Sequence, residues 1–326
     1  MDFRELIRLM SDGAFHSGEQ LGEVLGVSRT AIWKQLRKLE ALGIQVEGIR
    51  GQGYRLAQPI ELLDGARIVS HLTAPARQGL SRLFVEISLD STNSFILRRF
   101  SQKAGHGEVC LAEMQVSGRG RRGRQWVASL GQGLCVSLGW RFDTSASHLE
   151  GLSLAIGVEV AQMLESIGVP VRLKWPNDLL VMRDDGVLCK LGGILVELRG
   201  DVNGPCEVVA GLGLNVNETP TLEELPQPVT SIAMHAGRVS RNEIAANLIS
   251  RLLVMFERFE REGFAPWRDE WNRYHAYRDM DVDIVQGVQQ WQGRALNVDG
   301  NGNLEVMRDG QLQKLSGGEI SIRKYS

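Results

Sequence analysis

The N-terminal part of the chain alternates short amphipathic segments with turns. Apolar residues recur at helical spacing in three segments, and a Ser stands before the second and the third, as N-cap residues do. The expected elements are helices over 2–10, 18–25 and 29–42 and strands over 44–49 and 54–57. Gly26-Val27-Ser28 makes the turn between the second and third helices, and Gly43 ends the third. This order predicts a winged helix-turn-helix.

The third helix of this unit has two chemically different faces. At about 100° per residue, Ile32, Leu36 and Leu39 share one side. The other side is polar and basic, and its candidate DNA contacts are Ser28, Arg29, Thr30, Trp33, Lys34 and Arg37. A helix that contacts phosphates needs such a basic stripe. The alternatives are a solvated helix face and, for Trp33 alone, a place in the core.

Beyond residue 64 the pattern changes to strands separated by helices. Apolar or alternating runs predict strands over 83–89, 108–115, 171–174, 190–198 and 211–217. A corner at 90–93 begins a helix that ends near Gln102, and 242–262 is a long amphipathic helix. After Trp271 the chain forms short alternating strands with turns. We therefore expect an α/β (α+β) protein with domains at 1–63, 64–273 and 274–326.

Composition and charge exclude several classes of protein. Of the 326 residues, 43% are hydrophobic and 23% charged, which supports packed cores and argues against disorder. The 37 Lys and Arg and 39 Asp and Glu give a net charge of −2, so any nucleic-acid contact must come from a local patch. No apolar run approaches the roughly 18 residues of a membrane span, and the charged start is unlike a secretory signal. The four widely spaced cysteines predict reduced, buried thiols in a soluble, cytoplasmic protein.

The segment 118–126, which we call the Arg-Gly loop, combines three glycines with four arginines. Glycines let backbone N–H groups converge on an anion, and arginines add fixed donors for phosphate or carboxylate. Its GxGxxG spacing also occurs in dinucleotide-binding proteins, but those continue into a helix, whereas Gln125-Trp126 does not begin one. We therefore interpret the loop as a clamp for an anion. The alternatives are a solvent loop and a second nucleic-acid patch.

Two further segments carry candidate chemistry. The corner Trp175-Pro176-Asn177-Asp178 ends a strand and can offer amide and carboxylate groups to a nucleotide and its Mg²⁺, although a plain Asx turn explains it equally well. Lys190 lies at the start of an apolar strand beside Gly192 and Gly193, which permit close approach of a ligand; the alternative is a solvated lysine. Asn215 lies in another glycine-rich strand.

Together these motifs resemble the bifunctional biotin–protein ligases that also repress the biotin operon. The resemblance covers nearly the whole chain and rests on the winged helix, Ser91-Thr92-Asn93, the Arg-Gly loop, Lys174–Asp178, Lys190–Leu195 and Gly317–Ser321. It implies a winged helix-turn-helix, a central mixed-sheet domain of the class II synthetase type, and a C-terminal SH3-like barrel that supports the nucleotide side and carrier docking. For the barrel, a purely structural cap is the alternative.

The resemblance also implies roles for single residues. Biotin-binding positions are Ser91, Thr92, Asn93, Gln115, Arg119, Gly120, Arg121, Lys190 and Gly193. Nucleotide-binding positions are Arg121, Arg122, Trp126, Asn177, Asp178, Lys190 and Asn215. Lys190, Arg119 and Arg121 would be catalytic, and Asp178 would bind Mg²⁺. One departure is the segment 218–232, which has no aromatic residue, whereas some relatives fold an aromatic from here over the adenine.

The implied reaction joins biotin and ATP to biotinyl-5′-AMP and transfers biotin to a lysine of the biotin carboxyl carrier protein of acetyl-CoA carboxylase. The implied regulation is a homodimer, formed with the adenylate bound, that binds a palindromic operator and represses biotin synthesis genes. Two other functions are weighed. A non-catalytic, ligand-sensing transcription regulator shares the winged helix, and a lipoate or octanoate transferase shares the catalytic architecture.

Overall fold

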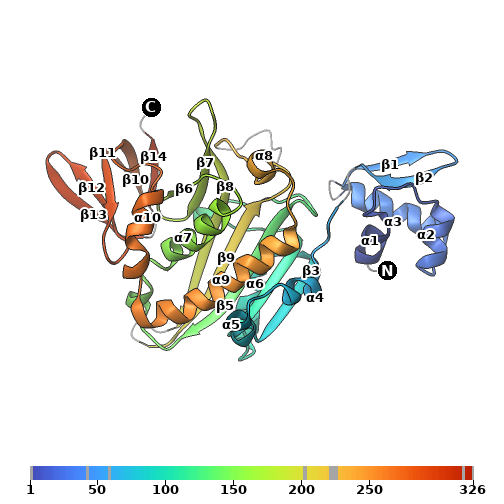
Figure 1. Ribbon diagram of the computed structural model, residues 1–326, viewed down its shortest axis with the longest axis horizontal. Helices are drawn as coiled ribbons and strands as arrows, with labels where there is room; N and C mark the ends of the chain where they lie inside the picture. Colours follow the sequence, from blue (N-terminus) through green and yellow to red (C-terminus); the bar gives the residue numbers. More distant parts are fainter. Residues whose placement is uncertain are drawn as a thin grey trace.

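A computed structural model describes residues 3–41, 44–57, 60–200, 204–219, 227–317 and 320–324. The N-terminal domain lies at one end of an elongated molecule and a five-stranded sheet lies at the other (Figure 1). The N-terminal elements are α1 (Phe3–Met10), α2 (Gly18–Val24), α3 (Arg29–Ala41), β1 (Val46–Ile49) and β2 (Gly53–Leu56). The winged helix-turn-helix is confirmed, while the predicted stop at Gly43 lies outside the described residues.

The caps and faces of the N-terminal helices follow the predicted pattern. Ser17 caps α2 in a reciprocal box with Gln20, and the amide of Ala31 donates to Ser28 Oγ at the start of α3. Ile32, Leu36 and Leu39 are all buried. Trp33 is 49% exposed and lies under the guanidinium of Arg37, so it belongs to the outer face of α3 and not to the core.

The central domain is built on a seven-stranded mixed sheet of order β3-β4-β5-β9-β8-β7-β6. Its strands are β3 (Arg82–Leu89), β4 (Glu108–Gln115), β5 (Gly133–Phe142), β6 (Val171–Lys174), β7 (Asp178–Met182), β8 (Leu188–Gly200) and β9 (Cys206–Asn215). Only β3 and β4 run parallel, and the remaining pairs are antiparallel. The mixed sheet is therefore confirmed.

Helices cover both faces of this sheet. Alternate residues of β4 separate the two faces: Val109 and Leu111 join the large core with α7 and α9, while Cys110 joins a small cluster with Ile96 and Phe100. The helices are α4 (Gly65–Ser70), α5 (Ala74–Gly79), α6 (Thr92–Ser101), α7 (Leu152–Glu165), α8 (Ala233–Ala236), α9 (Arg241–Glu262) and α10 (Arg268–Tyr274). The N-terminus of α6 therefore opens on one side of the sheet, and this end positions the site.

The C-terminal segment forms a five-stranded antiparallel sheet of order β13-β12-β11-β10-β14, as expected for an SH3-like unit. Its strands are β10 (Asp281–Gln286), β11 (Gln289–Val298), β12 (Leu304–Arg308), β13 (Gln311–Leu315) and β14 (Ile320–Lys324). Its buried side chains continue the core of the central domain, and the indole of Trp175 donates to Gly302 O at 3.1 Å. Gly318 and Glu319 of the predicted C-terminal motif lie outside the described residues.

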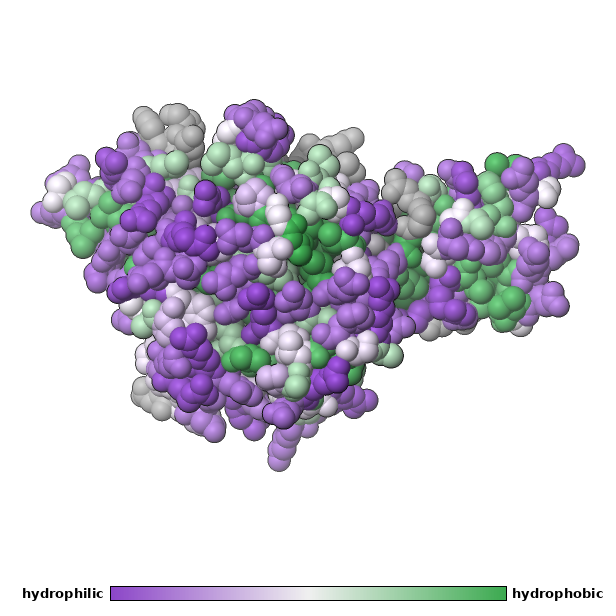
Figure 2. All heavy atoms as spheres, in the orientation of Figure 1, coloured by the Kyte–Doolittle hydropathy of each residue, from purple (hydrophilic) through white to green (hydrophobic). Residues whose placement is uncertain are grey.

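The N-terminal domain is docked on the central domain through side chains from both. Leu130, which follows the Arg-Gly loop, is buried in the core cluster of the N-terminal domain together with Ile60. Arg4 of α1 donates to the carbonyls of Leu63 and Val85. Figure 2 shows apolar surface gathered where the two parts meet.

A buried ion pair fixes the segment that joins the two domains. Arg241 and Glu113 are completely buried, and Arg241 Nη2 donates to Glu113 Oε2 at 2.6 Å. Arg241 also donates to Gly133 O and Glu61 O, while Glu113 accepts from the amide of Leu63. All the main donors and acceptors of this pair are therefore used, as a buried charge requires.

The structure bears on two predictions made from composition: the state of the cysteines and the presence of membrane-spanning helices. All four cysteines are buried and none forms a disulfide among the described residues, as predicted, and burial raises the pKa of the Cys135 thiol to about 12. Within the described ranges, no helix combines the length and the apolar character that crossing a bilayer demands.

Candidate active site

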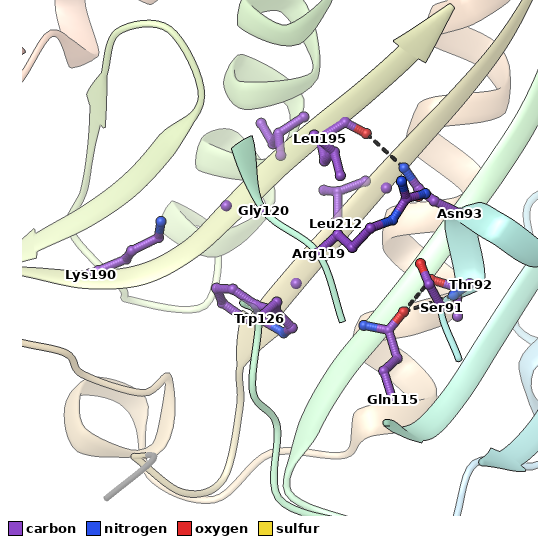
Figure 3. Close-up of a pocket in the computed structure, with 14 residues that line it drawn as sticks. Ser91, Thr92, Asn93, Gln115, Arg119, Gly120, Trp126, Lys190, Leu195 and Leu212 are labelled. Carbon is purple, nitrogen blue, oxygen red and sulfur yellow. Dashed lines mark hydrogen bonds between the residues drawn. The ribbon is translucent and has the colours of Figure 1, made fainter. Parts of the chain in front are cut away.

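A pocket lies where β8 and β9 meet the N-terminus of α6 and the Arg-Gly loop (Figure 3). It is lined by Ser91, Thr92, Asn93, Gln115, Arg119, Gly120, Trp126, Lys190, Gly193, Ile194, Leu195, Gly211, Leu212 and Gly213. The structure therefore brings together all of the predicted biotin positions except Arg121. Ile194, Leu195 and Leu212 were not predicted as lining residues.

Polar groups gather at the α6 end of the pocket. Ser91 caps α6, and both the amide and the hydroxyl of Thr92 donate to Gln115 Oε1. The hydroxyl of Ser137, on β5, lies 2.7 Å from Thr92 Oγ1 and 2.6 Å from Asn93 Oδ1. Ser137 is fully buried and was not predicted from the sequence. This network holds three predicted side chains in fixed orientations.

The glycines of β9 make room for pocket side chains. A Cβ atom at Gly211 would lie 2.0 Å from Asn93 Oδ1, and one at Gly213 would lie 2.2 Å from the Trp126 ring. Both glycines therefore permit Asn93 and Trp126 to lie flat against the strand. Trp126, predicted at the nucleotide, lines the same pocket as the predicted biotin positions.

The Arg-Gly loop forms a tight hairpin whose tip is a single 3-10 turn over Arg121–Gly123. The amide of Gly120 donates to Arg124 O at 2.7 Å, and the amide of Trp126 donates to Gly118 O at 2.9 Å. The chain after Gly123 is extended and begins no helix. The dinucleotide-binding alternative is therefore wrong for this loop.

The loop arginines have different surroundings. Arg119 Nη2 donates to Ser94 Oγ at 3.2 Å and to Glu197 Oε2 at 3.1 Å. Arg121 Nη1 donates to Asn177 Oδ1 at 3.3 Å, and burial lowers the pKa of this guanidinium. Arg122 is exposed. The first two arginines thus contact opposite walls of the site, and neither is a free surface charge.

Lys190 lies at the end of the pocket opposite to Gln115 and Thr92 (Figure 3). Its Nζ donates to Asp178 Oδ1 at 2.6 Å and lies 6.0 Å from the centre of the Trp126 ring. Its side chain is only 19% exposed. The alternative of a solvated lysine is therefore wrong.

The remaining nucleotide positions support the site from behind the pocket surface. Asn177 Nδ2 donates to Ile194 O at 2.8 Å, a contact across two strands, so its side chain is not used in a local Asx turn. Asn215 is buried and donates to Thr230 O at 2.9 Å, which holds the segment after residue 227 beside Lys190. Residues 220–226 of the aromatic-free segment lie outside the described residues.

Asp178, the predicted position for Mg²⁺, is paired with two lysines in this structure. The two carboxylate oxygens of Asp178 face the ammonium groups of Lys190 at 2.6 Å and Lys174 at 3.8 Å. Across the described ranges, no group of three His, Cys, Asp or Glu side chains could hold a metal ion. Mg²⁺ at nucleotide sites is usually bound by one or two carboxylates together with substrate phosphates and water, so a single carboxylate here is compatible with the ion, and Mg²⁺ binding by Asp178 stays a prediction.

The predicted DNA-contact residues share one exposed surface. The side chains of Ser28, Arg29, Thr30, Trp33, Lys34 and Arg37 are all exposed on or before α3. A groove lies beside them, between the start of α2, Arg29 and the turn of the wing at Arg50. Arg37 is 65% exposed, and within the described residues its ion-pair partner is Glu40 of its own helix. This surface can accept a strand of nucleic acid.

Comparison with known proteins agrees with both halves of this description. A model of the biotin/lipoate A/B protein ligase family matches residues 85–215, and a helix-turn-helix domain model matches residues 3–55. The bifunctional ligase/repressor BirA of Salmonella typhimurium is 39% identical over 98% of this chain and 96% of its own length, and that of Escherichia coli is 38% identical over the same shares. A biotin protein ligase from Aquifex aeolicus, solved in complex with biotin and ATP, has a TM-score of 0.64 at 25% identity and covers 76% of this chain and 100% of its own.

Proposed function

This chain belongs to the bifunctional biotin ligase and repressor family, and from that premise we propose that its loop-covered pocket binds biotin and joins it to AMP. The observation that carries the proposal is the pocket itself, which brings Ser91–Asn93, Gln115, the Arg-Gly loop and Lys190 around one cavity. The ligase activity uses ATP and forms AMP, and the helix-turn-helix domain serves repression.

The distribution of polarity in the pocket suits biotin. Amide and hydroxyl groups gather near Asn93, apolar side chains such as Leu195 and Leu212 line the middle, and Lys190 lies at the far end (Figure 3). Biotin has a polar ring urea, an apolar chain and a terminal carboxylate. The carboxylate would therefore lie near Lys190, where a positive charge stabilises it.

The chemistry needs positive charge more than it needs a nucleophile on the protein. The biotin carboxylate attacks the α-phosphorus of ATP, a new C–O–P linkage forms, and the bond to pyrophosphate breaks. Lys190 and Arg121 supply positive charge where the two anions meet, and Asp178 holds the Lys190 ammonium in place. The adenylate is a mixed anhydride, and the loop would keep water from it.

The second half of the reaction transfers the acyl group to a protein. The amine of an acceptor lysine attacks the acyl carbon, an amide forms and AMP leaves. We propose the biotin carboxyl carrier protein of acetyl-CoA carboxylase as the acceptor. We further propose that the adenylate-bound chain forms a homodimer that binds operator DNA, because a ligand shifts assembly only if it binds the dimer better than the monomer.

The activity is tested with the purified chain, biotin, ATP, Mg²⁺ and the apo-carrier, by following the mass of the carrier and the release of pyrophosphate. The expected result is one biotin per carrier. Release of pyrophosphate with lipoate but not with biotin would instead identify a lipoate-activating enzyme. No release with either acid would identify a non-catalytic regulator.

Arg121→Ala is expected to speed dissociation of biotinyl-5′-AMP by about 10- to 100-fold, since a hydrogen bond to a charged group contributes about 1.5–3 kcal/mol. Arg121 is the half-buried loop arginine that faces Asn177. Stopped-flow measurement of the dissociation rate checks this. Arg124→Ala is the matched control, because Arg124 is exposed on the same loop. Equal rates in the two variants would remove Arg121 from the clamp.

Arg37→Ala is expected to weaken binding to the operator and to reduce the slope of log K against log salt by about 1, the share of one phosphate contact. Arg8→Ala is a closely matched control. Arg8 is 64% exposed and pairs with Glu5 three residues away, as Arg37 is 65% exposed and pairs with Glu40. Gel-shift titrations at several salt concentrations measure the effect. Equal slopes for the two variants would place the phosphate contact elsewhere.

A further inference from the structure

The carboxylate of Glu197 lies behind the pocket and contacts two of its parts at once. Glu197 is in β8, opposite Val209 of β9, and its side chain is 25% exposed. Its Oε2 accepts from Asn93 Nδ2 at 2.7 Å and from Arg119 Nη2 at 3.1 Å. One oxygen atom therefore joins the fixed wall of the pocket to the loop that covers it.

The first contact decides how the Asn93 amide is oriented. Its two N–H groups are both used, one on Glu197 and one on Leu195 O at 3.2 Å. Its oxygen lies 2.6 Å from the hydroxyl of Ser137 and has one further lone pair. Because both N–H groups are used, the amide has an acceptor but no donor left for a ligand. A ligand with an N–H group meets this requirement.

The second contact holds the Arg-Gly loop at its base. The loop contains four arginines within seven residues, so its positive charges repel one another when it closes. The ion pair with Glu197 offsets part of that repulsion at Arg119, next to the hydrogen bond that Arg119 makes with Ser94. The tip is held separately, by Arg121 on Asn177.

We propose that Glu197 is a positioning residue that turns the oxygen of Asn93 toward the pocket and holds the Arg-Gly loop closed through Arg119. The proposal rests on the proposed function, since it takes the occupant to be a ligand with a urea N–H at one end and an anionic group under the loop. Glu197 is not among the residues that line the pocket, so it acts through Asn93 and Arg119, which are.

Two substitutions separate the two roles. Glu197→Gln keeps an oxygen that can accept from Asn93 but removes the charge that pairs with Arg119. Glu197→Leu removes both. Glu207→Gln is the matched control, because Glu207 is also a strand residue of the sheet, is 23% exposed and pairs with Arg141 at 3.0 Å. The measurements are trypsin cleavage within the loop without ligand, adenylate dissociation, and KM for biotin and for ATP.

Glu197→Gln is expected to raise the rates of loop cleavage and adenylate dissociation by about three- to tenfold, because this is the effect of losing a partly exposed ion pair. The KM for biotin is expected to stay within about twofold. Glu197→Leu is expected to raise KM for biotin by about tenfold or more while KM for ATP stays within about twofold. A general loss of structure would raise both KM values together.

Each of the two roles of Glu197 has a result that would contradict it. Cleavage and dissociation rates of Glu197→Gln equal to those of the unmodified chain would overturn the loop-holding role, as would an equal rise in Glu207→Gln. An unchanged KM for biotin in Glu197→Leu would overturn the orienting role. Failure of the proposed function is distinguishable, because the unmodified chain would then release no pyrophosphate, while the ligand-free cleavage rates still decide whether Glu197 holds the loop.

Discussion

Lys190→Ala is expected to slow pyrophosphate release by about 100- to 1000-fold, the usual loss when one preorganised donor to developing charge is removed. Lys190 lies at the end of the pocket where we propose that the biotin carboxylate binds, and its ammonium is held 2.6 Å from Asp178. Its removal takes away positive charge from the point where two anions must meet. It also removes the shorter of the two ion pairs of Asp178, leaving the one with Lys174 at 3.8 Å, so the site becomes more negative.

The double variant Lys190→Ala with Asp178→Asn separates these two effects. If the stranded carboxylate causes most of the loss, the double variant recovers most of the rate. If the ammonium itself stabilises the reacting anions, the double variant stays slow, and this is the result we expect. Single-turnover release of pyrophosphate measures the chemical step. A normal rate in Lys190→Ala would reject the role of Lys190 altogether.

Glu113→Leu is expected to lower the free energy of unfolding by about 3–5 kcal/mol, because it leaves the charge of Arg241 buried without its partner. Both side chains are completely buried and share a 2.6 Å contact. Chemical denaturation followed by tryptophan emission checks this. Six of the seven tryptophans lie outside the N-terminal domain, so the signal reports the central and C-terminal parts.

The double variant Glu113→Leu with Arg241→Met is the control for this prediction. Replacing both members of a buried pair by apolar residues is often nearly neutral, so part of the lost stability is expected to return. The recovery is incomplete, because the amide of Leu63 and the carbonyls of Glu61 and Gly133 lose their partners. Equal stability of Glu113→Leu and the unmodified chain would show that the pair contributes nothing.

The sequence predicted those elements whose side chains meet two different environments. In α3 and α9 one face is buried and the other exposed, so apolar residues recur at helical spacing, and both helices were placed within one or two residues. The strand β3 and the cap of α6 were also predicted, because an apolar run is followed by a recognisable capping sequence at 90–93.

Two central elements were not predicted because their surroundings are uniform. No element was predicted from the sequence between residues 127 and 170, yet β5 and α7 lie there. Ten of the fourteen residues of α7 are buried, so it has no clear polar face to set a helical period. In β5 only Arg141 is exposed, since the strand lies in the middle of the sheet with helices on both sides.

Parts of the candidate site were predicted where the local residue types form a recognisable motif. Residues that reach the site only through contacts with distant parts of the sequence were missed. Glycine and arginine together marked the Arg-Gly loop, and a lysine beside two glycines marked Lys190. Glu197 and Ser137 were missed, because each resembles an ordinary strand residue until folding brings it to Asn93, some 104 and 44 positions away. Pairwise contacts of this kind leave no local pattern.

The position of Leu130 affects whether the DNA-binding domain can be separated from the ligase domain. It belongs to the stretch that continues from Trp126, yet its side chain is 5% exposed within the core of the helix-turn-helix domain. A fragment that ended after residue 63 would lack one of its own interior side chains, a loss of about 2–5 kcal/mol for a buried leucine. The N-terminal domain therefore cannot be exchanged for another DNA-binding domain without further change. A replacement domain would need an apolar cavity that accommodates the side chain of Leu130.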